Sequence, residues 1–407
     1  MFNLYIDPGT GSMLFAVIIG IASTLFFLVQ RFWIKLKFIF SSGRVKEDAD
    51  KKSLVIFGED GRYWNIFHSV CDELENRGVE CEYYTMDKND PSLSCDYKHI
   101  HPSFIGEGNK AFAKLNMLKA NVLFTTTPGL DVYQWKRSRN VDKYLHIYHA
   151  VDEGAGYRMF GMDFFDSILM ASQFQVDTVR RLEKLRKEAP KEIQIVGSPY
   201  LDDLDRKAKN FVADKKNSED KVVLLAPSWG ESSILSKFGD EMIDALVKTG
   251  YHIIVRPHPQ SKIVEKEVLD PLLERYPESD QIEWDNNIDG FPSLSRADIM
   301  ISDFSSVVFD FALIFNKPVI FADTDFDKSP YDAAWFDEDL WRLRVLDQMG
   351  VSLKQEDFPC MKELIKELTE NDRFGEGREK LREQLWAKRG ESAKSIADYL
   401  EEQLKVG

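Results

Sequence analysis

The chain has 407 residues, of which 43% are hydrophobic, 12% aromatic and 30% charged, a composition typical of a folded protein and not of a disordered one. At about 150 residues per domain, the length predicts two or three domains and excludes a small scaffold held together by disulfides. The 53 basic and 68 acidic residues give a net charge of −15, which argues against a nucleic-acid-binding protein with a broadly basic surface.

The first 46 residues differ from the rest in charge and hydropathy. They carry a net charge of +4, which leaves −19 for the remainder. Residues 12–29 are uncharged and mostly apolar, and as a helix they would extend about 27 Å, close to the roughly 30 Å of a hydrocarbon core. The basic, aromatic residues 31–37 follow. We therefore predict a transmembrane helix at about residues 12–30 within a membrane anchor, residues 1–46.

The charges that flank this helix predict its orientation. Only Asp7 is charged before it, whereas basic residues follow it, so the positive-inside rule predicts a single-pass protein of the cell membrane with a cytoplasmic body. A cleaved signal peptide would need a basic N-terminal region, which is missing here. A buried soluble helix is the other alternative.

The body of the chain alternates between apolar strand patterns and amphipathic helix patterns. The first run predicts a helix that ends near Arg77 and strands at residues 53–57, 79–84, 121–126, 144–149, 166–171 and 193–196. A sharp break follows at Gly197-Ser198-Pro199, and the polar residues 207–220 are predicted to be a linker. The four cysteines, Cys71, Cys81, Cys95 and Cys360, show no metal-binding spacing, and we expect them to be reduced, partly buried residues.

The alternation then starts again. This run predicts helices at residues 239–249, 307–315 and 376–404 and strands at residues 221–226, 251–255, 297–301 and 318–321. Two such runs predict an α/β protein with two doubly wound, Rossmann-like domains, residues 47–212 and 213–385, followed by a C-terminal helix at 386–407. Ligands of such sheets bind beyond the carboxyl ends of the strands, so we expect a site in a cleft between the domains.

His149 is the first candidate for chemistry, because it lies at the end of a predicted strand. A histidine titrates near neutral pH and can act as a general base toward a hydroxyl group. Asp152 or Glu153 is predicted to hold its tautomer. A structural role for this loop histidine is the alternative.

Two further motifs follow strands of the second run. Arg256-Pro-His258-Pro projects a guanidinium and an imidazole from a stiff loop, which suits an anionic ligand such as phosphate. Ser302-Asp303-Phe-Ser305-Ser306 leads into a predicted helix whose first N–H groups would bind phosphate. A solvated turn and an ordinary N-cap are the respective alternatives.

No metal site is predicted. The acidic residues Asp323, Asp325 and Asp327 have the spacing of a metal-binding loop, but Lys328 stands where an EF-hand requires glycine. We expect no metal or other cofactor.

Several of these motifs together resemble the CDP-glycerol glycerophosphotransferase family, whose members build teichoic-acid-type polyol phosphate chains. The resemblance covers roughly residues 140–335 and rests on Gly197-Ser-Pro with Asp202, Leu225-Ala-Pro-Ser-Trp229, Arg256-Pro-His-Pro259, Ile301-Ser-Asp-Phe-Ser-Ser306, Phe309-Asp-Phe311 and Lys317-Pro-Val-Ile-Phe321. It implies a GT-B fold with an N-terminal acceptor domain and a C-terminal nucleotide-donor domain, and transfer without a metal. Tyr148-His149-Ala150 stands where the family has Trp-His-Gly, which leaves the acceptor open.

The resemblance also implies roles for individual residues. His149 and His258 would be catalytic, and Arg256, Ser302, Asp303, Ser305 and Ser306 would bind the phosphates of the donor. Gly197, Ser198, Pro227 and Ser228 would line the donor cleft.

The hypothesis from the sequence is thus a membrane-anchored transferase. It would move glycerol phosphate, or a related polyol phosphate, from CDP-glycerol to a lipid-linked or polymeric acceptor. A GT-B glycosyltransferase that uses a sugar nucleotide and an inactive, membrane-tethered nucleotide-binding relative are the alternatives.

Overall fold

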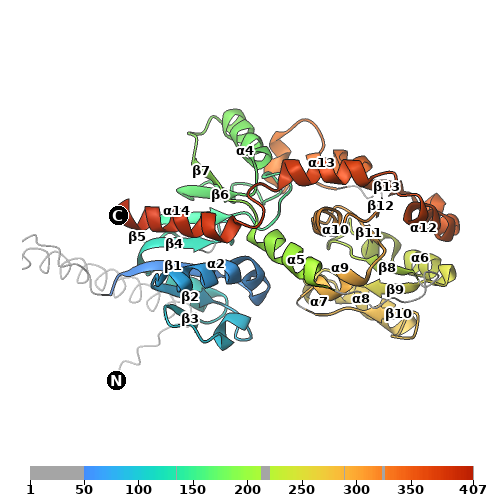
Figure 1. The fold of residues 1–407 in the computed structure, drawn as a ribbon, viewed down its shortest axis with the longest axis horizontal. Helices are drawn as coiled ribbons and strands as arrows, with labels where there is room; N and C mark the ends of the chain where they lie inside the picture. The colour runs from blue at the N-terminus through green and yellow to red at the C-terminus, as the bar shows by residue number, and fades with distance from the viewer. Residues whose placement is uncertain (1–49, 134, 212–220, 288, 323–325, 407) are drawn as a thin grey trace, which may run out of the picture. The chain divides into compact units, whose positions relative to one another are not determined.

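The computed structural model describes residues 50–133, 135–211, 221–287, 289–322 and 326–406 (Figure 1). The predicted transmembrane helix lies outside these ranges, as do Asp323, Asp325 and most of the predicted linker. Within them, no helix combines the length and the apolar character needed to cross a membrane. Residues Lys52–Gly407 form one unit, which contains two β-sheets.

The first sheet has seven parallel strands in the order β3-β2-β1-β4-β5-β6-β7. The strands are β1 (Lys52–Gly58), β2 (Cys81–Thr85), β3 (Ile100–Phe104), β4 (Lys119–Thr125), β5 (Asn140–Ile147), β6 (Ser167–Met170) and β7 (Glu192–Ile195). The helices between and after them are α2 (Trp64–Arg77), α3 (Asn109–Leu115), α4 (Gln173–Arg186) and α5 (Pro199–Asn210), with the short 3-10 helices η1 (Gly61–Tyr63) and η2 (Pro91–Ser94). The strand order reverses between β1 and β4.

The second sheet has six parallel strands in the order β10-β9-β8-β11-β12-β13. They are β8 (Val222–Leu225), β9 (His252–Val255), β10 (Ile282–Trp284), β11 (Ile299–Ser302), β12 (Val319–Ala322) and β13 (Gly350–Leu353). The helices are α6 (Ile234–Thr249), α7 (Ser261–Val264), α8 (Lys266–Arg275), α9 (Phe291–Arg296), α10 (Val307–Phe315), α11 (Trp341–Arg344), α12 (Met361–Glu370), α13 (Gly375–Leu385) and α14 (Ser392–Val406), with η3 (Asp332–Trp335), η4 (Leu346–Gln348) and η5 (Gln355–Cys360). Here the order reverses between β8 and β11. Two parallel α/β sheets were predicted from the sequence, and the structure confirms them.

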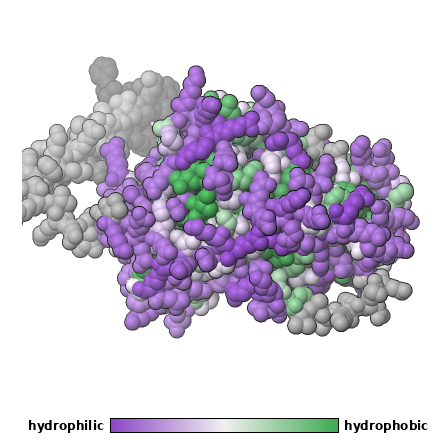
Figure 2. Space-filling view, turned by 45° about the horizontal axis from the view of Figure 1, so that its top comes forward, coloured by the Kyte–Doolittle hydropathy of each residue, from purple (hydrophilic) through white to green (hydrophobic). Residues whose placement is uncertain are grey.

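The central strands are continuous apolar runs because helices cover both faces of each sheet. All four residues of β8, for example, are buried. Each sheet has one hydrophobic cluster on either face, formed by its own strands and the helices that pack on them. On the surface, the face in Figure 2 is mostly hydrophilic, with smaller hydrophobic areas between the hydrophilic residues.

Three predicted boundaries were wrong. Helix α6 begins at Ile234, five residues before the predicted start, because the Ser233 side chain accepts the Ser236 N–H (3.3 Å) and caps the helix. Helix α5 continues to Asn210, into the predicted linker. The predicted helix at residues 376–404 is two helices, because Lys388 and Gly390 have φ angles of 49° and 77°.

The chain crosses between the two sheets after α13. Leu381 and Leu385 of α13 pack in a cluster of the second sheet, whereas Ile396 and Leu400 of α14 pack in a cluster of the first. Figure 1 shows α14 beside α2, at the other end of the crossing. The Asp202 carboxylate holds the crossing segment through the Trp386 Nε1–H (2.9 Å) and the backbone N–H groups of residues 390 (2.8 Å) and 392 (3.0 Å).

Candidate functional site

The sequence motifs lie where the topology of the two sheets predicts a ligand. In the first sheet, the loops after β1, β4 and β5 follow the strands on either side of the reversal in strand order. In the second sheet, the loops after β8, β9 and β11 likewise follow strands on either side of the reversal in strand order. The carboxyl ends of parallel strands at such a reversal are the usual binding position in these folds.

A pocket of about 450 Å³ lies between these two sets of loops. Both catalytic candidates, His149 and His258, line it. The first-sheet half also contributes Arg62, Tyr63, Asn65, Ile66 and Tyr200, and the second contributes Trp229, Pro259, Gln260, Ser306 and Asp310. The structure therefore brings together two histidines that are far apart in the sequence.

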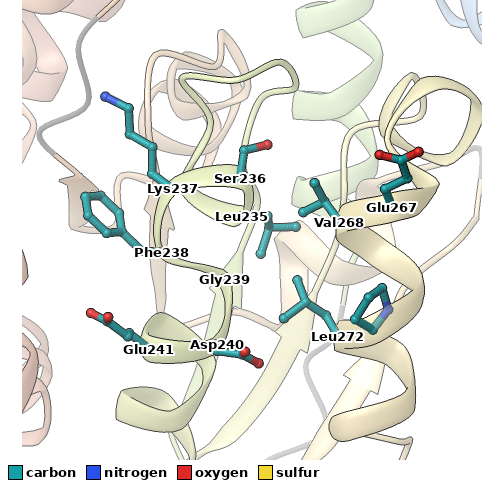
Figure 3. Close-up of a pocket in the computed structure, with 11 residues that line it drawn as sticks. Leu235, Ser236, Lys237, Phe238, Gly239, Asp240, Glu241, Glu267, Val268 and Leu272 are labelled. Atoms are coloured by element: carbon teal, nitrogen blue, oxygen red, sulfur yellow. The ribbon is translucent and has the colours of Figure 1, made fainter.

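Another pocket, of about 300 Å³, lies between α6 and α8 (Figure 3). Its floor is apolar, with Leu235 and Leu272, and its rim carries Asp240, Glu241 and Glu267. None of the predicted site residues lines it, and its acidic rim is unsuited to a phosphate ligand.

His149 lies two residues after the end of β5, and its imidazole contacts two hydroxyl groups. Nδ1 lies 2.8 Å from Tyr157 Oη and 3.4 Å from Thr126 Oγ1. The Thr126 hydroxyl donates to the Ile147 carbonyl (2.9 Å). Burial, followed by the charges of Arg62 and Arg342, lowers the pKa of His149 to about 4. The imidazole is therefore uncharged at neutral pH.

The prediction that Asp152 or Glu153 holds the His149 tautomer was wrong. Both carboxylates pair instead with Arg342, at 3.1 Å from Asp152 Oδ2 and 3.8 Å from Glu153 Oε1. Glu153 also accepts the N–H of Trp341 at the start of α11 (2.9 Å). These acidic residues connect the two halves of the unit, and hydroxyl groups orient His149.

The Nδ1 atom of His258 accepts a hydrogen bond from the backbone. The Gln260 backbone N–H donates to His258 Nδ1 (3.1 Å), so the neutral ring carries its proton on Nε2. Its ring centroid lies 6.2 Å from that of Trp229. Burial, followed by the charge of Arg62, lowers the pKa of His258 to about 4. His258 is thus an uncharged Nε2–H donor at neutral pH.

Asp303 is buried and connects the loops that follow β8 and β11. Its Oδ1 accepts the N–H groups of Ser228 (2.8 Å) and Ser305 (3.2 Å), and its Oδ2 accepts that of Ile234 (3.0 Å). Ser302, also buried, donates from Oγ to the Ala226 carbonyl (2.6 Å). In this structure Asp303, Ser302 and the Ser228 backbone hold the loops after β8 and β11 together.

Ser306 immediately precedes α10 and lines the pocket, whereas the Ser305 N–H is bound to Asp303. One turn into α10, Asp310 also lines the pocket, as does Tyr200. Burial raises the pKa of Asp310 to about 8, so this carboxyl group carries a proton at neutral pH. Ser306 therefore lines the pocket at the start of α10, and the neighbouring Asp310 adds no negative charge there at neutral pH.

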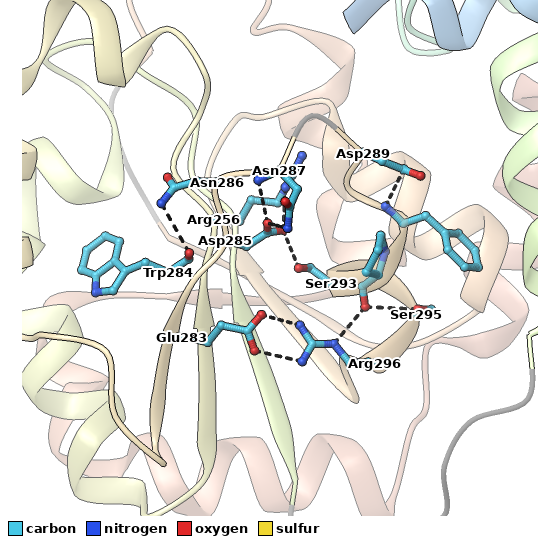
Figure 4. A network of polar contacts seen from close by, with 12 residues as sticks. Arg256, Glu283, Trp284, Asp285, Asn286, Asn287, Asp289, Ser293, Ser295 and Arg296 are labelled. Atoms are coloured by element: carbon cyan, nitrogen blue, oxygen red, sulfur yellow. Dashed lines mark hydrogen bonds and ion pairs between the residues drawn. The ribbon is translucent and has the colours of Figure 1, made fainter. Parts of the chain in front are cut away.

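Arg256, predicted to bind phosphate, forms an ion pair in the loops beside the pocket (Figure 4). Its Nη1 lies 2.5 Å from Asp285 Oδ2, and this buried carboxylate also accepts the Ser293 hydroxyl (2.5 Å) and the Asn287 N–H (2.9 Å). Arg256 does not line the pocket. Asp285 already compensates much of its charge.

Gly197 and Ser198, predicted to line the donor cleft, lie where α5 meets the crossing segment. Gly197 has a φ of 87°, and a Cβ there would lie 2.7 Å from the Ala387 carbonyl oxygen. The Ser198 side chain accepts the Leu201 N–H (3.3 Å) and caps α5. Pro227 is buried after β8, beside Ser228. None of these four residues lines the pocket.

Residues 108–334, more than half of the chain, match the family described as CDP-glycerol:poly(glycerophosphate) glycerophosphotransferase. The chain belongs to this family. The resemblance found in the motifs is thereby confirmed, and the protein is a member of a transferase family.

A relative of this glycerophosphotransferase family member supports the assignment to the family. The teichoic acid glycerol-phosphate primase of Bacillus subtilis (strain 168) is 32% identical over 130 residues, which are 31% of this chain and 32% of the primase. The match thus spans about a third of the length of the curated relative.

Solved structures show the same fold. The wall teichoic acid polymerase TagF has a TM-score of 0.59 at 15% identity, over 93% of this chain and 98% of that one. The UDP-GlcNAc 2-epimerase of Neisseria meningitidis, bound to UDP-GlcNAc, has a TM-score of 0.55 at 14% identity, over 86% and 100% of the two chains. These neighbours confirm the predicted GT-B-like fold.

The sequence did not predict several residues that line the pocket of this glycerophosphotransferase family member. Asp310 and Trp229 line it and lie in the motifs that carry the family resemblance. Arg62 follows β1 directly, a position that the reversal in strand order indicates. Tyr157, which contacts His149, lies in a loop without any local pattern.

Proposed function

We propose that the protein moves glycerol phosphate, or a related polyol phosphate, from CDP-glycerol to a hydroxyl group of a lipid-linked or polymeric acceptor in the synthesis of a teichoic-acid-type envelope polymer. The observation that carries the proposal is the meeting of His149 and His258, one from each half, in one pocket. Family membership supports the donor and the reaction class.

His149 is the proposed general base. A base at Nε2 requires the proton to be on Nδ1, and the surrounding hydroxyl groups favour that tautomer. In the proposed arrangement Tyr157 Oη accepts Nδ1–H of His149, and the Tyr157 proton is directed to Thr126 Oγ1, which can accept it because the Thr126 hydroxyl donates to Ile147. In this arrangement both hydroxyl groups are satisfied and the Nε2 lone pair takes the acceptor proton.

His258 is the proposed hydrogen-bond donor to the nucleotide. The acceptor oxygen forms a bond to the phosphorus of the glycerol phosphate, the anhydride P–O bond breaks, and CMP leaves with that electron pair. His258 Nε2–H stabilises the charge that develops on CMP. The start of α10, with Ser305 and Ser306, binds phosphate oxygens.

Two further parts of the proposal concern cofactors and location. These groups supply charge stabilisation from the protein, so we propose transfer without a metal ion. We also propose that residues 12–30 anchor the protein in the cell membrane with its body on the cytoplasmic side, near a membrane-bound acceptor. Nucleic acid has no part in this function.

The test is nucleotide release from the purified full-length protein in detergent. CDP-glycerol, CDP-ribitol and UDP-sugars are each incubated with lipid-linked and polymeric acceptors, and CMP and UDP are quantified. We expect CMP from CDP-glycerol, dependent on the acceptor. Release of UDP from UDP-sugars alone would instead indicate a glycosyltransferase, and binding of CDP-glycerol without CMP release from any acceptor would indicate an inactive relative.

The dependence of kcat/KM on pH tests the protonation states. The base must be unprotonated, and because the pKa of His149 is lowered to about 4, activity is lost only as the pH falls through about 4. At the alkaline end, ionisation of Asp310 near pH 8 adds a negative charge beside the phosphates. We therefore expect kcat/KM to be level between about pH 5 and 7.5. An acid limb near 6.5, with the fold intact by circular dichroism, would contradict a buried, neutral base.

A further inference from the structure

Arg62 lies at the reversal of strand order in the first sheet and lines the pocket with both histidines. It is part of η1, which directly follows β1. It precedes residues 108–334, so the match to the family includes no part of this loop. Its presence in the pocket follows from the structure alone.

Among the described residues, the Arg62 guanidinium is hydrogen-bonded only through Nε, and its Cζ lies 5.9 Å from the centroid of the Tyr63 ring. Asp60 Oδ1 accepts both the Arg62 backbone N–H (2.9 Å) and Nε–H (2.8 Å), which folds the side chain back on its own loop. In the parts of the chain that the structure describes, the Arg62 side chain forms its hydrogen bond and ion pair from Nε to Asp60. The terminal nitrogens Nη1 and Nη2 are left as a planar fork, and 31% of the side chain is exposed.

The charge of Arg62 acts on both histidines. Arg62 lines the same pocket as His149 and His258, and its positive charge contributes to the lowered pKa of each. In the proposed reaction, the phosphorus that is attacked lies between the base and the leaving nucleotide. A cation near both histidines is therefore near that phosphorus.

We propose that Arg62 binds the phosphoryl group in transfer, the β-phosphate of a nucleoside diphosphate donor, through Nη1 and Nη2. This inference rests on the proposed function, because it takes His149 and His258 as the two ends of the reaction. A guanidinium fork matches two phosphate oxygens, and its contacts strengthen as charge develops on them. Arg62 would thus carry a charge role that the sequence had assigned to Arg256.

The experiment measures the affinities of CMP, CDP and CDP-glycerol for the full-length protein in detergent by calorimetry. CMP lacks the β-phosphate. Arg62→Gln is therefore expected to lower the affinity for CDP and for CDP-glycerol by at least about tenfold, and to change the affinity for CMP by no more than about twofold. Arg62→Lys retains the charge without the fork and is expected to recover part of the loss. CMP release should fall by about 10²–10³-fold in Arg62→Gln.

The matched control is Arg275→Gln, an exposed arginine of α8 that pairs with Asp240 and Asp244. It should change none of these affinities, and circular dichroism verifies the fold of each variant. Equal weakening of CMP and CDP by Arg62→Gln, or no weakening, would overturn the inference while CDP-glycerol turnover by the wild type upholds the proposed function. If the wild type binds UDP and not CDP, the CDP-glycerol function fails, and UMP and UDP then test Arg62 in the same way.

Discussion

Replacing His149 with alanine is expected to lower kcat by about 10²–10⁴-fold, the usual contribution of a general base. The Kd for CDP-glycerol should stay within about threefold, because the proposed base acts on the acceptor hydroxyl and not on the donor. The measurement is CMP release at saturating donor and acceptor, with donor affinity determined separately by calorimetry. A loss in kcat without a loss in binding is the signature of a group that acts in the transition state.

The control for this prediction is His101→Ala, which removes an exposed imidazole from β3 in the same half. Tyr157→Phe tests how the base is oriented, because it removes the hydroxyl next to Nδ1. The ¹⁵N chemical shifts of His149 should indicate an Nδ1–H tautomer in the wild type and a larger Nε2–H fraction in Tyr157→Phe. An Nε2–H tautomer in the wild type, or full activity of His149→Ala, would contradict its role as base.

The sequence predicted the central strands well, because their apolar runs are continuous. It missed β3, β10 and β13 at or near the sheet edges. β3 contains His101 and Pro102, and β10 has only three residues, so neither presents a long apolar pattern. These segments become strands by pairing with a neighbouring strand, and the local sequence does not encode that pairing.

Cys360 was expected to be partly buried but is exposed, because it lies at the end of η5 on the surface.

The sequence could predict only those site residues that lie directly after a predicted strand. His149 and His258 were found because they lie at the carboxyl ends of β5 and β9. The partners of His149 were not found, because Tyr157 and Thr126 reach it from two other loops. Asp152 and Glu153 were closer in sequence, but Arg342 from the other half attracts both carboxylates. Proximity along the chain was a poor guide to contacts at a junction of several loops.

Asp303→Ala is expected to have the largest effect on stability among the residues around the site. This carboxylate is 1% exposed and accepts three backbone N–H groups from two loops and the start of α6. Each buried donor left without a partner costs about 1–3 kcal/mol, so the loss is roughly 3 kcal/mol or more. For a chain of this size, a loss of about 3 kcal/mol corresponds to a fall in Tm of about 4 °C, measurable by calorimetry.

Asp303→Asn separates this holding role from direct contact with the donor. The amide replaces one carboxylate oxygen by a donor, so at least one of the three N–H groups loses its partner. The loss of stability should therefore be smaller in Asp303→Asn than in Asp303→Ala. CDP-glycerol binding should weaken with stability in both variants, since the loops after β8 and β11 move apart. Asp327→Ala, which removes an exposed carboxylate that caps its own turn at Ser329, is the matched control and should change neither quantity. If Asp303 instead faced the phosphates directly, removing its negative charge would strengthen donor binding and leave Tm unchanged. That result would restore the role first predicted from the sequence.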